Sequence, residues 1–285
     1  MNAMAGAYVL IDVSYYEKYA SFAAWKRLKE DMALSDSPDT DPMQYPKFIE
    51  YLSGHFNFGL SEIIGKHYPM HNHSNFIFCT DCERNQIWRR DVFPGYKHKR
   101  DSVIHKFDSN GIHLWVSEWI KSHNTKYGSR SIGVPYAEAD DVISVLSKEL
   151  ISMDAEMDVL IISGDSDLLQ LGNDRVFQID SFGEIQSIEQ KLSKDKVAFE
   201  PTANNYLIYK VLCGDHSDDI PSVKHGKCGP KKAASLINDK QKLNEYVRSE
   251  LEISEAFVRN YNLISLGQTP KLIVESIKRK WQDAV

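Results

Sequence analysis

The sequence predicts an α/β fold, in which a mostly parallel, twisted sheet is flanked by helices and followed by a smaller helical region. Short apolar segments alternate with amphipathic ones up to about residue 200, and this alternation is typical of a doubly wound parallel sheet. Beyond residue 200 the strand signal fades and helical segments complete the chain. A length of 285 residues with 42% hydrophobic content is enough for one full core and a smaller second unit.

The predicted elements follow one another in a regular order. Apolar segments predict strands at 7–12, 75–81, 131–135, 159–163 and 175–180. Amphipathic segments predict helices after the first strand and at 47–66, 112–124 and 137–153. A polar, proline-containing loop at 35–46 and a basic segment at 84–106 interrupt this pattern.

The stretch VLIISGDSDLLQL, residues 159–171, ends a buried strand with two aspartates, Asp165 and Asp167. A helix N-cap is one explanation, because Ser and Asp cap first turns readily. A divalent-metal site is the other, because hard cations prefer carboxylate oxygens. The number of acids on the neighbouring strands distinguishes the two explanations.

Acids recur at the ends of the other predicted strands. The carboxyl ends of parallel strands share one edge of a sheet, where ligands bind. The acids expected at this edge are Asp12, Asp81, Glu138, Asp140, Asp141, Asp165 and Asp167. Interaction with a helix dipole accounts for one or two acids in a first turn, but not for seven. Two carboxylates about 6 Å apart repel by roughly 3 kcal/mol at an effective dielectric near 20, so the sequence predicts bound divalent cations.

Other metal or redox sites are less favoured. The motif Cys79-x-x-Cys82, with Cys213 and Cys228, is compatible with zinc or a redox pair, but ordinary packing fits a cysteine that ends an apolar strand better. A polar loop is favoured for the segment that holds His67, His71 and His73.

Charge and targeting patterns indicate which partners and which cellular location the protein has. The net charge is −6, yet four lysines and no acid lie between residues 224 and 232, so a local nucleic-acid surface is compatible with the total. No apolar run approaches the length of a membrane span, and the first residues lack a signal-peptide pattern. We therefore expect a soluble, intracellular protein with no membrane partner.

The acidic motifs, taken in order and spacing, resemble the flap endonuclease / 5′-3′ exonuclease family with its PIN-like fold. They are Asp12, Asp81, EADD (138–141), SGDSD (163–167) and GDHSDDIPSV (214–223). The basic segment IWRRDVFPGYKHKRD (87–101) is most similar to the phage replication ribonuclease H branch. The resemblance covers residues from about 7 to about 240, and it implies the cytoplasm of a prokaryotic or phage-infected cell.

The resemblance implies a PIN-like nuclease domain over 1–200, with a basic arch segment at 84–106, and a helical duplex-DNA-binding region over 201–285. It also implies two Mg²⁺ ions, for which Mn²⁺ can substitute. The first ion would be held by Asp12, Asp81, Glu138, Asp140 and Asp141. The second would be held, partly through water, by Asp165, Asp167, Asp215 and Asp218.

The arch segment would act on the substrate above the metals. Lys97 and Arg100 lie three residues apart, which predicts one helical face from which they neutralise the reacting phosphate, with Arg89 assisting. Tyr96 and Trp88 are predicted to stack on a displaced base, with core packing as the alternative for Trp88. Further nucleic-acid contacts in this segment are expected from Arg90 and Lys99.

The family's helix-hairpin-helix-type motif grips duplex phosphates and binds K⁺. Here it corresponds to HGKCGPKKA (225–233), which has two extra residues relative to the family's Gly-Ile-Gly-Pro-Lys turn. The resemblance implies contacts from Lys224, Gly226, Lys227, Gly229, Lys231 and Lys232, and a K⁺ site; a solvated loop is the alternative.

The implied activity is that of a monomeric 5′-3′ exonuclease and flap endonuclease that removes RNA primers or flaps during DNA replication by two-metal hydrolysis. Branched or flapped DNA and RNA–DNA duplex are the implied substrates, and a single-strand-binding protein or sliding clamp is the implied class of protein partner. Two alternatives remain. One is a PIN-type ribonuclease for single-stranded RNA, and the other is a catalytically inactive protein that binds branched DNA.

Overall fold

A computed structural model describes residues 6–37, 39–102, 106–224 and 228–284. The strands are β1 (Ala7–Asp12), β2 (Phe76–Cys79), β3 (Arg130–Ile132), β4 (Asp158–Ile162) and β5 (Val176–Ile179). They form one sheet in the order β3-β2-β1-β4-β5, with every pairing parallel. This confirms the predicted α/β class with its parallel sheet. The third strand ends at Ile132 rather than at 135, because its only neighbour, β2, ends at Cys79, the residue that pairs with Ile132.

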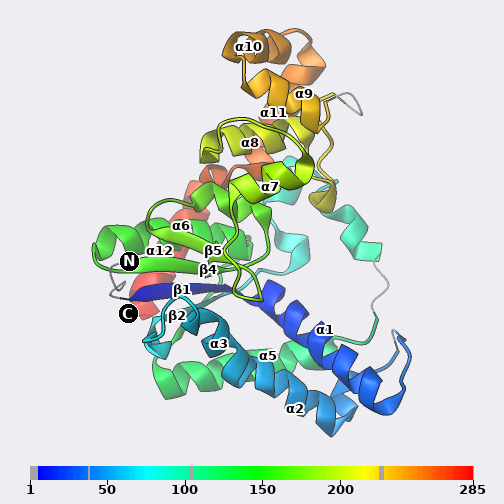
Figure 1. Ribbon diagram of the computed structural model, residues 1–285, viewed down its shortest axis with the longest axis vertical. Coiled ribbons are helices and arrows are strands. Elements are labelled where there is room, and N and C mark those ends of the chain that lie inside the picture. Colours follow the sequence, from blue (N-terminus) through cyan, green and yellow to red (C-terminus); the bar gives the residue numbers. More distant parts are fainter. Residues whose placement is uncertain (1–5, 38, 103–105, 225–227, 285) are drawn as a thin grey trace.

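Helices cover both faces of the sheet (Figure 1). Along β1, Val9 and Ile11 belong to one core and Leu10 to the other, as expected for a parallel sheet buried on both faces. The first core is covered by α1 (Val13–Met32), α2 (Pro46–Gly54), α3 (Leu60–Gly65) and α5 (Asn110–Tyr127). A π-helical turn, η2 (His55–Gly59), joins α2 to α3, so the helix predicted at 47–66 is continuous.

The second face is covered by α6 (Ala139–Met153) and by the last helix, α12 (Lys271–Ala284). Ile277 and Trp281 of α12 are buried in the core that contains Leu10. The final helix therefore packs with the sheet, although it lies at the far end of the sequence. The predicted division of the chain at residue 200 stays a prediction.

A third tier of helices lies beyond the sheet, at the top of Figure 1. It comprises α7 (Ile188–Asp195), α8 (Ala203–Cys213), α9 (Pro230–Ile237), α10 (Lys240–Arg248) and α11 (Leu251–Ile264). This tier has its own apolar core, which includes Leu212, Ala233 and Ile253. The short helix α4 (Arg89–Val92) contacts α11.

The remaining short helical turns are η1 (Pro42–Gln44), η3 (His73–Asn75), η4 (Arg84–Gln86), η5 (His98–Ser102), η6 (Ser166–Leu171), η7 (His216–Asp218) and η8 (Leu266–Gln268). Within the described ranges, no helix combines the length and apolar character that a bilayer crossing requires.

Candidate active site

The carboxyl edge of the sheet gathers acids from separate parts of the chain. Asp12 ends β1, Asp81 follows β2 and Asp165 follows β4. The Ser163 hydroxyl donates to Asp12 Oδ2 at 2.9 Å, which ties β1 to the turn after β4. The Ala139 N–H at the start of α6 donates to Asp81 Oδ1 at 2.8 Å. The predicted convergence of these acids at one edge is therefore present.

Several of these aspartates also cap helical elements: Asp12 caps the long helix α1, whereas Asp165 and Asp215 cap the short turns η6 and η7. Asp12, Asp165 and Asp215 each accept a hydrogen bond of 2.8–3.1 Å from a backbone N–H two or three residues further along the chain. Each cap uses Oδ1, and although Oδ2 of Asp12 accepts from Ser163 and Oδ2 of Asp215 contacts Lys210, a carboxylate oxygen has a further lone pair for a metal ion. The N-cap explanation and the metal-site hypothesis are therefore compatible.

A buried lysine lies between two of the acids. Lys210 of α8 is 7% exposed; its ammonium group contacts the carboxylate of Asp167 and lies 2.7 Å from Asp215 Oδ2. Burial alone would lower the pKa of Lys210, but the two carboxylates outweigh it and hold that pKa well above its usual value. The sequence analysis missed Lys210. Its signal was a single cation within the otherwise apolar run YLIYKVLC, 206–213.

Lys97 and Arg100 both contact the acids, although they do not share the helical face that was predicted, and their role at the reacting phosphate stays a prediction. Lys97 Nζ lies 2.5 Å from Glu138 Oε1 and 3.6 Å from Asp218 Oδ2, and Arg100 Nη2 lies 2.7 Å from Asp218 Oδ1. Lys97 has a φ of 53°, and η5 begins only at His98. A left-handed residue therefore turns the chain so that both cations reach Asp218.

Arg89 lies in a different environment from the one predicted. Its side chain is 1% exposed, and its guanidinium donates to Glu138 at 2.8 Å, to Asp141 at 2.9 and 3.0 Å and to the Leu263 carbonyl at 2.9 Å. These bonds leave no face of the guanidinium open to a phosphate. Arg89 is an interior ion-pair partner in this structure, and its predicted assistance at the reacting phosphate stays a prediction.

Asp141 is the centre of the same interior network. It is fully buried and accepts hydrogen bonds of 2.7–3.0 Å from Arg89, Trp88 Nε1, the Glu138 N–H and Thr269 Oγ1. These donors come from α4 and its N-terminal flank, the start of α6 and the loop before α12. The predicted metal role of Asp141 stays a prediction, while its observed contacts join three parts of the fold.

The two aromatic residues predicted to stack on a base are also buried. Trp88 is 7% exposed and donates to Asp141, so its core-packing alternative describes the structure. Tyr96 is 1% exposed, and its hydroxyl lies 3.0 Å from both Glu138 Oε2 and Asp218 Oδ2. Both rings are buried in this structure, and the predicted stacking on a displaced base stays a prediction.

The other predicted basic contacts lie nearer the surface. Arg90 Nη2 donates to the Lys97 carbonyl at 3.5 Å, and Lys99 Nζ lies 2.7 Å from Asp219 Oδ1. Lys224 pairs with Glu250.

The predicted duplex-binding motif is partly described. Gly229 is the N-cap of α9, and the exposed Lys231 and Lys232 follow in its first turn. Lys232 Nζ lies 4.2 Å from the centre of the Tyr246 ring. Gly226 and Lys227 fall outside the described residues. The nucleic-acid role of the motif stays a prediction.

Burial and mutual repulsion shift the acidity of several of these acids. Burial, followed by the charge of Asp81, raises the pKa of Asp12 to about 7. Burial, followed by the charge of Glu138, raises the pKa of Asp140 well above its usual value. Burial would likewise raise the pKa of Glu138, but Lys97 and Arg89 outweigh it and hold that pKa below its usual value. Negative charge is thus balanced at Glu138 and unbalanced at Asp12 and Asp140.

The donor chemistry of this edge fits hard divalent cations, which prefer carboxylate oxygens and favour sites of unbalanced negative charge. In the part of the chain that the structure describes, no three Asp, Glu, His or Cys side chains already form a metal cage. Asp12, Asp81, Asp140 and Asp165 have no ion pair to a basic residue among the described residues, so they are the acids with negative charge left to bind a cation.

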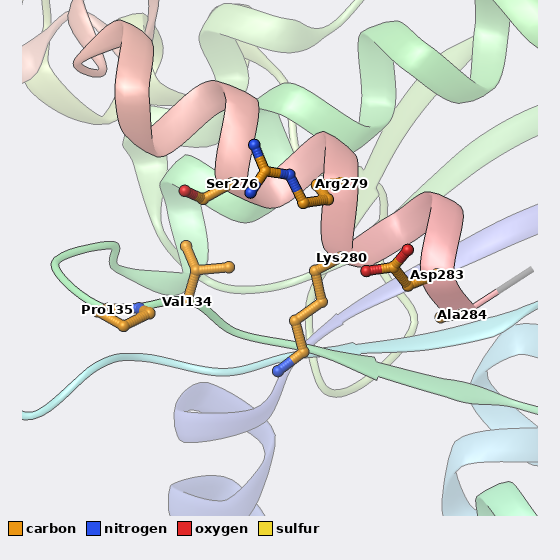
Figure 2. A pocket seen from close by; sticks show the side chains of 7 residues that line it. All are labelled: Val134, Pro135, Ser276, Arg279, Lys280, Asp283 and Ala284. Carbon is orange, nitrogen blue, oxygen red and sulfur yellow. The ribbon is translucent and has the colours of Figure 1, made fainter.

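The alternative cysteine and histidine sites have ordinary explanations. All four cysteines are free thiols, and Cys79 is buried, as packing predicts. His67 contacts the Gly183 carbonyl at 2.7 Å, and His73 Nδ1 lies 3.0 Å from His123 Nε2 in an aromatic cluster. A surface pocket of about 390 Å³ lies elsewhere, between the Val134–Pro135 loop and the α12 side chains Ser276, Arg279 and Lys280 (Figure 2). None of the predicted site residues lines it.

The sequence of this chain is similar to a family of nucleases and to individual members of it. Residues 52–200 match the family described as "5'-3' exonuclease, N-terminal resolvase-like domain". The flap endonuclease Xni of Shewanella pealeana is 28% identical over 194 residues, a match that spans 63% of this chain and 69% of that protein. DNA polymerase I of Lactococcus lactis subsp. cremoris is 30% identical over 182 residues, but this match spans only 19% of the polymerase.

Two solved structures share the fold. The zinc-bound T5 5′-exonuclease has a TM-score of 0.61 at 15% identity, with 98% of this chain and 100% of that chain covered. The bacteriophage T5 flap endonuclease, in a pseudo-enzyme–product complex with DNA and metal ions, has a TM-score of 0.61 at 15% identity and coverage of 98% and 99%.

Proposed function

The chain belongs to the 5′-3′ exonuclease family that includes the flap endonucleases, and from this premise we propose that it is a divalent-metal-dependent, structure-specific 5′ nuclease. One observation carries the proposal. Acids from β1, β2, α6, the turn after β4 and the turn after α8 meet beside the basic residues of the arch segment. An acidic metal-binding edge with cations beside it is an arrangement suited to phosphodiester hydrolysis.

The proposed metal ligands are the nine predicted carboxylates. Asp12, Asp81, Asp140 and Asp165 are the strongest candidates, because no basic side chain in the described residues pairs with them. Two bound Mg²⁺ ions would activate water and stabilise the leaving oxygen. The solved T5 relatives with bound metal ions support divalent dependence, and Mn²⁺ is expected to substitute.

The chain's own cations would bind and orient the substrate. Lys97 and Arg100 are already aimed at the acidic edge, where they contact Glu138 and Asp218. A phosphate placed there could exchange those carboxylate contacts for its own oxygens, and Arg100 could bind it in a bidentate manner. Arg89 would hold Glu138 and Asp141 in place from the interior rather than contact the phosphate.

The substrate class follows from the same features. We propose 5′ flaps and RNA–DNA duplex ends, which the enzyme would process during removal of RNA primers. The α9 start with Lys231 and Lys232 would grip duplex phosphates, and a K⁺ ion would bind in the adjacent turn. A replication protein such as a single-strand-binding protein or a sliding clamp remains the proposed class of partner.

The test uses a 5′-labelled flap DNA and a 5′-labelled RNA–DNA duplex, with Mg²⁺ and with EDTA. Wild type should cleave both substrates with Mg²⁺ and neither with EDTA. The control Asp174→Asn, which changes an exposed acid away from the edge, should behave like wild type, whereas Asp165→Asn should not cleave in either condition. Equal cleavage by wild type and Asp165→Asn would refute the proposal. Preference for unstructured RNA would favour the PIN-type ribonuclease, and junction binding without turnover in Mg²⁺ or Mn²⁺ would favour the inactive binding protein.

A further inference from the structure

We propose that Gln178 is a positioning residue of this site, whose side-chain amide holds the turn that carries Asp165 and Asp167. The inference rests on the proposed function. Gln178 lies on β5, next to the strand that leads into the turn, and is 5% exposed. Among the described residues it is the one buried polar side chain on any of the five strands. A polar group in that position needs a reason, because burial of an unpaired amide is costly.

The reason is a pair of hydrogen bonds to the turn. Gln178 Nε2 donates to the carbonyl oxygens of Ser163 and Asp165, each at 2.8 Å. Both neighbours can only accept, so the nitrogen rather than the oxygen of the amide must face them. Gln178 Oε1 is buried and has no hydrogen-bond partner among the described residues. The side chain therefore satisfies the turn's carbonyls while its own oxygen goes unpaired.

The turn is also confined from the side of α1. A Cβ on Gly164 would lie 2.5 Å from the Tyr15 ring, so the backbone is already in close contact with that ring. The Tyr15 hydroxyl is fixed in turn by the Ser181 N–H at 2.9 Å. The turn is thus held between the ring of Tyr15 and the amide of Gln178.

Movement of this turn would disturb the acids together. Ser163 Oγ accepts from the Asp165 N–H at 3.1 Å and donates to Asp12 Oδ2 at 2.9 Å, and Asp165 Oδ1 accepts from the Asp167 N–H at 2.8 Å. A shift of the Ser163 carbonyl would therefore alter Asp12, Asp165 and Asp167 at once. Misplacement of reacting groups by about 1 Å can slow a reaction about 100-fold, so Gln178 should influence turnover more than substrate affinity.

The matched experiment compares Gln178→Met with Gln186→Met. Methionine keeps the length of the side chain but removes both donors. Gln186 is a nearby glutamine whose amide also donates to a carboxylate and a carbonyl, those of Asp180 at 3.1 Å and Glu184 at 3.0 Å. Its contacts do not include the turn at 163–167, so it controls for the loss of a glutamine amide in the same region.

Two measurements distinguish the effect of Gln178 on the rigidity of the turn from its effect on catalysis. Amide hydrogen exchange of the metal-free proteins should be about ten-fold faster over 163–168 in Gln178→Met and unchanged there in Gln186→Met. On a 5′-flap substrate with Mg²⁺, Gln178→Met should lower kcat by about 10- to 100-fold with KM within about two-fold of wild type. Gln178→Asn, which keeps the amide but is one methylene shorter, should show both effects in smaller measure and serves if Gln178→Met does not fold.

Each outcome bears on the inference. Unchanged exchange over 163–168 in a folded Gln178 variant would overturn the holding role, and faster exchange with wild-type kcat would overturn the positioning role. A wild-type protein that cleaves no substrate would refute the proposed function and with it the catalytic part of the inference, whereas the exchange measurement would still decide whether Gln178 holds the turn.

Discussion

The acids of the carboxyl edge form two groups whose charge is balanced in different ways. The cation-paired group consists of Glu138, Asp141, Asp167, Asp215 and Asp218, which contact Arg89, Lys97, Arg100 or Lys210. The sheet-edge group consists of Asp12, Asp81, Asp140 and Asp165, for which the described residues provide no such cation. Asp12 and Asp81 are held instead by a hydroxyl or a backbone N–H, as in the Ser163–Asp12 and Ala139–Asp81 hydrogen bonds.

The difference separates the acids whose charge the protein neutralises itself from the acids that are the strongest proposed metal ligands. In the cation-paired group, the protein supplies its own positive charge, and removal of one partner would leave a buried charge unpaired. In the sheet-edge group, negative charges lie close together without compensation, and the pKa values of Asp12 and Asp140 are raised as a result of burial and neighbouring charge. This division does not coincide with the two predicted metal sites. Asp141, predicted for the first metal ion, belongs to the cation-paired group, and Asp165, predicted for the second ion, belongs to the sheet-edge group.

The largest expected effect is on cleavage by a sheet-edge variant. The side chain of Asp140 makes no hydrogen bond or ion pair within the described residues, so Asp140→Asn should leave the metal-free protein at least as stable as wild type. The same change should lower Mg²⁺-dependent flap cleavage about 1,000-fold, since a metal supplies several kcal/mol of charge stabilisation to the transition state. Initial rates and urea unfolding measure the two quantities, with Asp174→Asn as the control. If Asp140→Asn is clearly less stable than wild type, Asp140 belongs to the cation-paired group instead.

The second prediction concerns the interior network. Asp141→Ala removes the acceptor for Arg89, Trp88 and Thr269, and should lower the free energy of unfolding by about 3–5 kcal/mol, because Arg89 would be left partly unpaired. Added Mg²⁺ should not restore this loss. Urea unfolding with and without Mg²⁺ measures it, against Asp174→Ala. A loss that widens when Mg²⁺ is added would show that Asp141 also binds the metal and belongs with the sheet-edge group.

A smaller effect is expected when the internal cation is removed. Lys210→Met should lower the free energy of unfolding of the metal-free protein by about 2 kcal/mol. The loss is limited because burial already raises the pKa of Asp167 to about 7, so that this carboxyl can take up a proton. Saturating Mg²⁺ should narrow the difference from wild type, because a divalent cation can replace the ammonium group. If Mg²⁺ leaves the stability difference between Lys210→Met and wild type unchanged, the metal ion does not bind where the Lys210 ammonium group lies.

The sequence was sufficient for the sheet and for the positions of the acids along it. Apolar periodicity is local, so the segments around Val9, Phe78 and Ile161 could be assigned as strands without knowledge of their neighbours. In a parallel sheet, whatever follows each strand meets at one edge. The same rule places Asp12, Asp81 and Asp165 together.

The balance of charge could not be predicted, because it depends on contacts between distant segments. Arg89 and Arg100 belong to one basic segment, yet Arg89 is interior and Arg100 lies near the surface. Lys210 reaches the edge only through the packing of α8 against η6. The turn at Lys97 required a left-handed residue, for which a lysine gives no signal.

The smallest expected effect is a pH dependence that separates Asp12 from its asparagine variant. In the folded metal-free protein the pKa of Asp12 is raised to about 7, whereas in the unfolded chain it returns to the ordinary value near 3.8. Between these two values the folded state binds more protons than the unfolded state, so wild type loses stability as the pH rises from about 4 to 7.

Asparagine does not titrate, and its amide can keep the hydrogen bonds to the Tyr15 N–H and Ser163. The advantage of Asp12→Asn in free energy of unfolding should therefore grow across this window and level off above pH 7. Urea unfolding at pH 5, 6, 7 and 8 measures this advantage, and Mg²⁺ should reduce it by stabilising wild type more than the variant. An advantage that is the same at every pH would mean that Asp12 is already balanced by the protein and belongs with the cation-paired group.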